Sequence, residues 1–329
     1  GQLLFGGAYG LADRSWQIEN EINTRFRLAS VSKLFTAVAV LQLVDGGQLA
    51  LEMPVAAPLG LETSQISPTV TVDHLLTMTA GIADWFEEGE DWAEAWATLR
   101  QEHPLYLLRE NVDYLPFFVD EPPLAPVGER YRYNNASYIL LGLLIEKASG
   151  IAYFDYVRDQ IFAPAGMTDS DFLPLDEISE NVAEGYMPIT DEGEVIAGWK
   201  RNIYDVTPVP AADGGATAPA GDLLRFLTAI RDGTLLSRVS RELLLTPHGI
   251  DTETTYRDYQ WEYGYGFQFL RGAGGEIVRY GKTGEEEGVS CRLYHYPQQG
   301  LDVVILGNQS WCAGKLGWQI HDLIVGVQG

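Results

Sequence analysis

The stretch RFRLASVSKLFTAVAVLQLVDGG, from Arg25 to Gly47, decides the fold because it leads from an extended segment into a long apolar helix. Apolar residues run almost without a break from Leu34 to Val44 and recur at helical spacing. A helix that is apolar on nearly every side is a buried one, so we expect this helix in the core. The glycines after Asp45 end it, because glycine accepts the left-handed conformation found at helix C-termini.

Two polar residues, Ser30 and Lys33, stand at the start of this apolar run. They are three residues apart, so one helical turn places them on the same face, whereas Ser32 points away from Lys33. One interpretation is a serine nucleophile with a lysine base, whose pKa must be lowered by burial or a nearby cation. The other is a serine cap followed by a lysine that extends to the surface. The S-x-x-K pattern does not decide, because chance produces it in roughly one chain in five of this composition.

The composition limits the partners of the chain. It has 329 residues, 46% of them hydrophobic, which is enough for a large core and two domains. Lys and Arg number 22 against 46 Asp and Glu, so nucleic acids and anionic membrane surfaces would be repelled. A membrane-spanning helix needs about 20 consecutive apolar residues, and the sequence contains no such run. This acidic, lysine-poor composition fits a protein from a high-salt or extracellular setting and also an ordinary acidic bacterial protein. We expect a periplasmic or secreted location rather than a cytoplasmic one.

Several common sites are excluded by their missing motifs. Two cysteines, Cys291 and Cys312, are too few for a disulfide framework or a zinc site. One disulfide bridge between them is possible. The five histidines lack metal-ligand spacing, and no G-x-S-x-G elbow occurs. The G-K-T segment ending at Thr283 is no phosphate loop, because Glu276 stands where that motif needs glycine. We therefore expect no metal ion and no cofactor.

The order of the predicted elements indicates an α/β fold, with an antiparallel sheet flanked by helices, formed from both termini, and an inserted, mostly helical domain. Strands are predicted at Leu4–Ala12, Thr24–Leu28, Tyr263–Leu270, Glu276–Tyr280, Val289–Tyr296 and Leu301–Leu306. Helices are predicted, after the one that follows Ser30, at Asp73–Thr79, Ala136–Ser149, Phe154–Phe162, Pro219–Arg231 and Leu316–Val327. The predicted division is residues 1–52 and 259–329 for the α/β domain and 53–258 for the insertion. The opening GQLLFGGAYG reads as the middle of a strand, so we expect that an upstream segment has been removed.

Two further motifs accompany the serine and lysine. Tyr133-Asn134-Asn135 presents a phenol and an amide just before a predicted helix. Lys282-Thr283-Gly284 ends a short apolar strand, where glycine permits close approach to a ligand. A tyrosine and two lysines in one cleft would lower one another's pKa, which would provide a base without histidine.

In this order, S-x-S-K at residues 30–33, Y-x-N at 133–135 and K-T-G at 282–284 resemble the motifs of the penicillin-recognising serine hydrolases, the class C β-lactamases with their DD-peptidase and esterase relatives. The segments HLLTMTAGI, GERYRYNNASYILLGLLIEKASG, IFAPAGMTDSDF and YGYGFQF also resemble that family, so the likeness covers almost the whole chain. The sequence departs from the family pattern at Met78, where many relatives have histidine, and in the three glutamates that follow Gly284.

The resemblance implies a mechanism for residues at the matching positions. Ser30 attacks a carbonyl carbon, and Lys33 and Tyr133 together take the serine proton and return it to the leaving group. Asn135 orients Lys33 and the substrate. Lys282 lowers the pKa of Tyr133 and helps to hold the substrate.

The resemblance also implies a substrate-binding strand at Thr283, Gly284 and Glu285. The backbone N–H groups of Ser30 and Glu285 form its oxyanion hole, in which one donor is typically worth about 3 kcal/mol. Water then cleaves the acyl-enzyme.

We therefore predict a metal-independent serine hydrolase that cleaves an ester or amide bond, with a small molecule or short peptide as substrate. An esterase, D-amino-acid peptidase or amidase is favoured narrowly over an efficient β-lactamase. The alternative is a penicillin-binding sensor that is acylated without turnover. The sequence does not fix the oligomeric state.

The chain also carries an acidic, tryptophan-bearing stretch from Asp84 to Glu102. Trp92 and Trp96 are four residues apart, which fits either a short helix packed on the body or a substrate-facing wall. If the carboxylates here and after Gly284 face the cleft, each close pair would repel an anionic substrate by about 1 kcal/mol. We then expect neutral or amine-bearing substrates to be preferred; otherwise these carboxylates are solvated surface charge.

Overall fold

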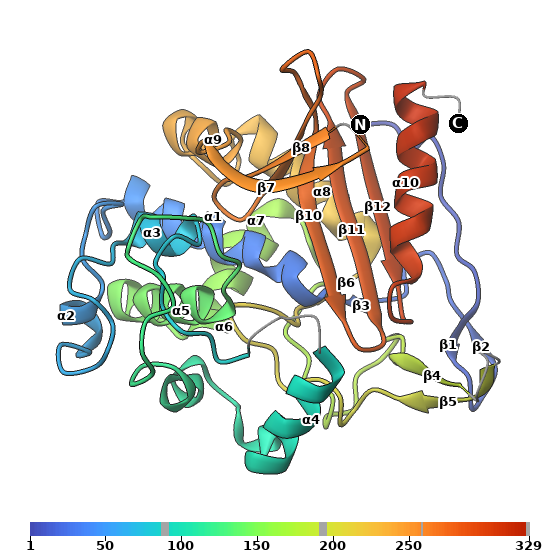
Figure 1. The fold of residues 1–329 in the computed structure, drawn as a ribbon. Coiled ribbons are helices and arrows are strands. Elements are labelled where there is room, and N and C mark those ends of the chain that lie inside the picture. The colour runs from blue at the N-terminus through green and yellow to red at the C-terminus, as the bar shows by residue number, and fades with distance from the viewer. Residues whose placement is uncertain (87–91, 191–195, 258, 327–329) are drawn as a thin grey trace.

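Helices pack on both faces of one six-stranded sheet in the computed structural model, which describes residues 1–86, 92–190, 196–257 and 259–326, without the side chains of 92–94, 102 and 250–256 (Figure 1). The strands of this sheet are, in order across it, β12 (Leu301–Gly307), β11 (Val289–Tyr296), β10 (Ile277–Glu286), β9 (Gln268–Arg271), β8 (Tyr259–Tyr263) and β7 (Ile250–Tyr256). Each strand pairs antiparallel with the next along the chain. The α/β fold class expected from the sequence is confirmed by the solved structures compared below.

The alternation of side chains along β10 places its residues on two different faces. In the β10–β11 register Lys282 lies opposite Leu293 and Gly284 opposite Cys291. Gly284 faces the helix that follows Ser30, since a Cβ there would touch the Leu28 carbonyl and Val31. The neighbours of Gly284 therefore point to the other face, over which helix α10 (Cys312–Val325) packs against β11 and β12.

The helix after Ser30 is buried on nearly every side, as predicted. It begins with a 3₁₀ turn, η1 (Ala29–Ser32), and continues as α1 (Lys33–Asp45). It packs against α5 (Asn135–Ser149), a second apolar helix capped by the Asn134 side chain and ended by Gly150. Both helices contribute to the main hydrophobic core.

Shorter elements surround this core. The two-stranded sheets are β1 (Leu11–Asp13) with β2 (Ile18–Glu19), β3 (Phe26–Arg27) with β6 (Thr217–Ala218), and β4 (Tyr186–Thr190) with β5 (Ile196–Arg201). The helices are α2 (Ala56–Leu59), α3 (Val72–Leu76), α4 (Trp92–Glu102), η2 (Leu105–Leu107), η3 (Asn111–Phe117), α6 (Tyr153–Val157), η4 (Arg158–Phe162), α7 (Ala163–Ala165), α8 (Ala220–Asp232) and α9 (Arg238–Leu244).

The predicted strand at Leu4–Ala12 is wrong except for its last two residues. Leu3, Leu4, Phe5 and Tyr9 are exposed, and strand structure begins only at Leu11, where β1 pairs with β2. Apolar alternation favours a strand only where a neighbouring strand takes the backbone hydrogen bonds, and β1 meets such a neighbour only over three residues.

Other boundaries also differ from the prediction: β10 extends to Glu286 rather than to Tyr280, and α10 begins at Cys312 rather than at Leu316. The predicted strand Tyr263–Leu270 is two strands, β8 and β9, because the chain turns at Gly264–Phe267. The helix predicted to stop at Phe162 continues through Pro164 to Ala165. A π turn precedes it, and proline is tolerated in the first turn of a new helical segment.

Within the described residues, no single helix is long and apolar enough to cross a membrane. One pair, Asn135–Ser149 with Tyr153–Ala165, reaches the required length only together and is bent by 79°. Both cysteines are free thiols in the structure.

Candidate active site

Ser30 lies on the short turn η1, which is held in an unusual backbone conformation. Ala29, directly before it, has φ of +47°, a left-handed value that non-glycine residues rarely adopt. The turn is held by neighbouring backbone: Leu28 N–H donates to the Ala216 carbonyl at 2.7 Å, and Gly215 N–H donates to the Ala29 carbonyl at 3.2 Å. Packing from the 205–218 segment therefore fixes the position of Ser30.

Ser32 braces the same turn. Its Oγ donates to the Ala29 carbonyl at 2.8 Å and accepts from Ala216 N–H at 3.0 Å. The side chain is fully buried. These two hydrogen bonds give Ser32 a structural role, and its hydroxyl is separate from the groups that surround Ser30.

The hydroxyl of Ser30 is contacted by both residues named as candidate bases. Tyr133 OH donates to Ser30 Oγ at 2.7 Å, and Lys33 Nζ donates to the same oxygen at 3.1 Å. Lys33 Nζ also donates to Asn135 Oδ1 at 2.8 Å and to the Asp213 carbonyl at 2.6 Å. The Lys33 side chain is completely buried, so these acceptors replace the water that its ammonium has lost.

A second lysine, Lys282, also lies close to the Tyr133 ring. Its Nζ is 4.7 Å from the centroid of that ring, whereas Lys33 Nζ is 5.1 Å from it. Lys282 also donates to Tyr263 OH at 3.2 Å, and burial raises the pKa of Tyr263 well above its ordinary value. Two buried ammonium groups therefore flank one phenol, and each favours negative charge on its oxygen.

The end of β10 lies directly against the turn that carries Ser30. A Cβ on Gly284 would be 2.2 Å from the Leu28 carbonyl oxygen and 3.2 Å from Val31 N, so only glycine fits there. Thr283 is held by Gln268, whose Oε1 accepts from Thr283 N–H at 3.3 Å and from Thr283 Oγ1 at 3.2 Å. The pairing of β10 with β9 ends at Gly281, so the K-T-G motif at residues 282–284 lies beyond the last paired residue.

The three glutamates after Gly284 have defined partners. Glu285 forms an ion pair with Arg292 at 2.5 Å, and Glu286 forms one with Arg27 at 2.8 Å. Glu287 accepts from Ser310 Oγ at 2.8 Å. Two of the three charges are therefore balanced by buried guanidinium groups, which reduces the repulsion expected from the sequence.

Asp84, predicted as a possible cleft-facing charge, caps helix α5. Its carboxylate accepts from Asn135 N–H at 2.7 Å and from Ala136 N–H at 2.8 Å. The helix dipole stabilises negative charge at a helix N-terminus, so the Asp84 carboxylate supports the helix that positions Asn135. The other predicted carboxylates, at Glu87, Glu88, Glu90 and Asp91, lie outside the described residues.

A small cleft of about 50 Å³ opens beside Ser30. One wall is aromatic and consists of Trp85, Phe86 and Trp96, which pack edge to face or tilted against one another. Trp96 is buried, so it both anchors α4 and lines the cleft, whereas the side chain of Trp92 is not described. The remaining lining is largely acidic and includes Asp205, Asp213, Glu285, Glu286 and Glu287.

Sequence reasoning missed Asp213, which joins the lysine to the aromatic wall. Its carbonyl accepts from Lys33 Nζ, and its carboxylate accepts from Trp85 Nε1 at 2.9 Å. Burial raises the pKa of Asp213, and the Lys33 charge opposes this rise. The only signal in the sequence was the glycine pair after it, which permits a tight loop beside Ala29.

The fit between Gly284 and the serine turn gives a testable consequence. We expect Gly284→Ala to push η1 away from β10, to lower the unfolding free energy by about 1–3 kcal/mol and to reduce labelling of Ser30 by a fluorophosphonate. Gly198→Ala is the matched control, because a Cβ there meets only Ile189 at 3.7 Å and should change neither property. Thermal unfolding measures the stability, and the rate of fluorophosphonate labelling measures the reactivity of Ser30. Unchanged labelling in Gly284→Ala would show that the contact between Gly284 and the serine turn does not position Ser30.

The sequence matches the family model described as "Beta-lactamase" over residues 1–311. A penicillin-binding protein of Bacillus subtilis is 28% identical over 94% of this chain and 66% of its own length. The esterase EstB of Burkholderia gladioli is 29% identical over 80% of this chain and 72% of its own length. The chain thus spans about two thirds to three quarters of these relatives.

Solved structures agree with the family model. A penicillin-binding protein from Bacillus halodurans superposes with a TM-score of 0.85 at 35% identity, over 96% of this chain and 91% of the other. D-amino acid amidase from Ochrobactrum anthropi shares the fold at 22% identity, with a TM-score of 0.70 over 92% of this chain and 81% of its own. These relatives include an enzyme named as an esterase, and the chain belongs to the β-lactamase family of serine hydrolases and penicillin-binding proteins.

Proposed function

We propose that this protein is a serine hydrolase that cleaves an ester or amide bond through an acyl-enzyme on Ser30. The observation that carries the proposal is the contact of one half-buried hydroxyl with two candidate bases, Tyr133 OH at 2.7 Å and Lys33 Nζ at 3.1 Å. A serine hydroxyl is a weak nucleophile until a neighbouring base takes its proton. The membership in a family that contains an esterase supports hydrolysis as the reaction.

The proton must leave Ser30 through Tyr133 or Lys33. In the resting arrangement both donate to Ser30 Oγ, so one of them has to lose a proton before it can act as the base. The ammonium of Lys282, 4.7 Å from the centroid of the ring, favours the phenolate of Tyr133. We therefore assign Tyr133 as the base for acylation, with Lys33 holding and exchanging its proton. Tyr133 returns that proton to the leaving group.

The negative charge that develops on the carbonyl oxygen needs donors close to Ser30. We assign this role to the backbone N–H groups of Ser30 and Glu285, because Gly284 brings the end of β10 into contact with the serine turn. Thr283, fixed by Gln268, would hold the substrate along this strand. Asn135 keeps Lys33 oriented through its Oδ1.

The cleft chemistry favours an acyl group that carries an aromatic or apolar side chain and a neutral or cationic end. The lining of the cleft combines the aromatic side chains of Trp85, Phe86 and Trp96 with several carboxylates. Glu287 has no cationic partner among the described residues, so its charge is the least balanced of the three glutamates. Amino-acid amides and esters have this combination of groups.

Replacement of the nucleophile tests the proposal directly. We expect Ser30→Ala to lower kcat/KM for a short-chain nitrophenyl ester by at least about 10³-fold. Ser32→Ala should retain acylation and lose only about 1–3 kcal/mol of stability, because it leaves Ala216 N–H without its acceptor. Mass spectrometry after mixing would show a transient adduct on Ser30. A lasting adduct without product would instead indicate the penicillin-binding sensor, and labelling of Ser30→Ala elsewhere would refute the assignment.

Loss of the phenol separates a catalytic Tyr133 from a structural one. We expect Tyr133→Phe to lower kcat by about 10²–10⁴-fold, the usual range for a general base, while the unfolding temperature changes little. The exposed Tyr204→Phe provides a matched control with the same chemical change outside the site. Near-normal kcat in Tyr133→Phe would leave Lys33 as the base.

The charge preference is tested with three matched esters that carry an ammonium, an amide or a carboxylate at the same place on the acyl group. We expect kcat/KM to be about fivefold lower for the carboxylate than for the amide, since one close repulsion is worth about 1 kcal/mol. At low salt, Glu287→Gln should reduce the difference in kcat/KM between the carboxylate ester and the amide ester. Glu276→Gln, in the exposed β9–β10 turn, should leave this difference unchanged. Equal turnover of all three esters by the native enzyme would remove any role for these carboxylates in selection.

A further inference from the structure

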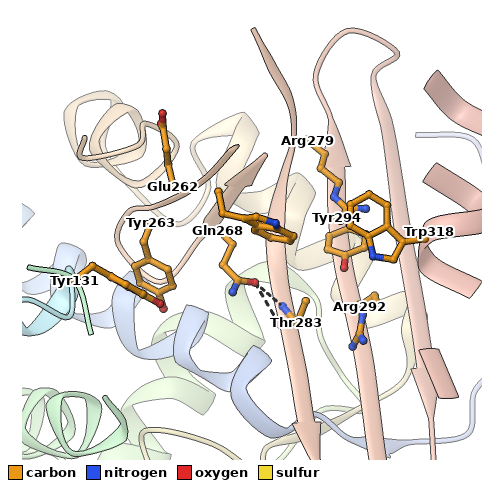
Figure 2. A pocket seen from close by; sticks show the side chains of 10 residues that line it. Tyr131, Glu262, Tyr263, Gln268, Arg279, Thr283, Arg292, Tyr294 and Trp318 are labelled. Atoms are coloured by element: carbon orange, nitrogen blue, oxygen red, sulfur yellow. Dashed lines mark hydrogen bonds between the residues drawn. The ribbon is translucent and has the colours of Figure 1, made fainter. Parts of the chain in front are cut away.

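A second, larger cavity of about 350 Å³ lies on the face of the sheet that points away from α1. Its lining comes from β8, β9, β10, β11, α10 and the segment before α5, and it includes Trp261, Arg279, Thr283, Arg292, Tyr294 and Trp318. Figure 2 shows Arg279, Tyr294 and Trp318 lying together, with Arg292 nearby and Thr283 hydrogen-bonded to Gln268. This volume is in the range of cavities that hold small organic ligands.

Arg279 is the unusual group in this cavity. Only 2% of its surface is exposed, and its guanidinium carbon is 4.0 Å from the centroid of the Tyr294 ring and 4.5 Å from that of Trp318. Among the described residues, its guanidinium donates one hydrogen bond, to Tyr296 OH at 3.4 Å. No carboxylate of the described residues lies within ion-pair distance of it, whereas Arg292, the other guanidinium here, is paired with Glu285.

A buried guanidinium without a counter-ion is costly, because the aromatic contacts return only part of the lost hydration. The charge of Arg279 acts on a neighbouring group: burial, together with repulsion from Arg279, lowers the pKa of His321 to about 4. The protein therefore keeps a positive charge beside an open, ring-lined volume. A negatively charged ligand would supply the missing counter-ion.

We propose that this cavity binds a small carboxylate that carries an aromatic ring, with the carboxylate on Arg279 and the ring against Trp261, Tyr294 and Trp318. Planar guanidinium and carboxylate groups match in a two-point contact, and aromatic rings prefer offset or edge contacts with one another. The cavity reaches Thr283, so two sources share this chemistry: a free carboxylate, and the far end of a substrate that extends past the K-T-G strand.

The test measures binding of benzoate to the full chain by calorimetry, with benzamide as its neutral counterpart. We expect benzoate to bind at least tenfold more tightly than benzamide, and Arg279→Met to lose at least tenfold in benzoate affinity. Methionine fills a similar volume and removes an uncompensated buried charge, so this variant should fold and unfold at the same or a higher temperature. Arg238→Gln, a change on the exposed face of α9, is the control and should bind like the native protein.

Binding is also measured with Ser30→Ala, so the result does not depend on the proposed hydrolase activity. Equal benzoate affinity in Ser30→Ala and in the native protein supports a site that exists apart from the nucleophile. In the native enzyme, competitive inhibition of ester hydrolysis by benzoate supports the site and assigns it to the far end of the substrate. Binding without competition supports it as a site for a free ligand. Equal affinities for benzoate and benzamide, or an unchanged affinity in Arg279→Met, would overturn the proposal.

Discussion

The buried ammonium of Lys33 is the group on which the rest of the site depends. It donates to Ser30 on its own turn, to Asn135 at the start of α5 and to the carbonyl of Asp213 in a distant loop. A buried charge must be surrounded by acceptors, so the burial of Lys33 holds three separate segments at fixed distances from the serine.

Much of this arrangement could be predicted from the sequence, because the informative residues lie on regular elements. The spacing places Ser30 and Lys33 on one turn, the apolar run predicts a buried helix, and the glycine of K-T-G permits close approach; the structure has all three features. Strands β10 to β12 were found because they alternate between clear turns. The first strand was misplaced because apolar residues near Leu4 have the right pattern without a partner strand.

The missed parts depend on contacts between residues far apart in the chain. Nothing near Glu285 or Glu286 in the sequence indicates that Arg292 and Arg27 form ion pairs with them, so this charge balance could not be predicted. The same holds for Asp213, whose carbonyl rather than its carboxylate meets the lysine. Local patterns predict elements and candidate residues, whereas pairing between elements decides which charges a substrate would meet.

The distance along the chain between the two halves of the site has a consequence for how the protein is made. Arg27 and Glu286, which lock the serine turn to β10, are separated by 259 residues. Closing so long a loop is slow relative to local helix formation, and strand β10 leaves the ribosome among the last elements. Lys282, which lies on β10, therefore meets the Tyr133 ring only at a late stage of folding. Incomplete chains thus contain the serine and its helix without the pocket that would make the serine reactive.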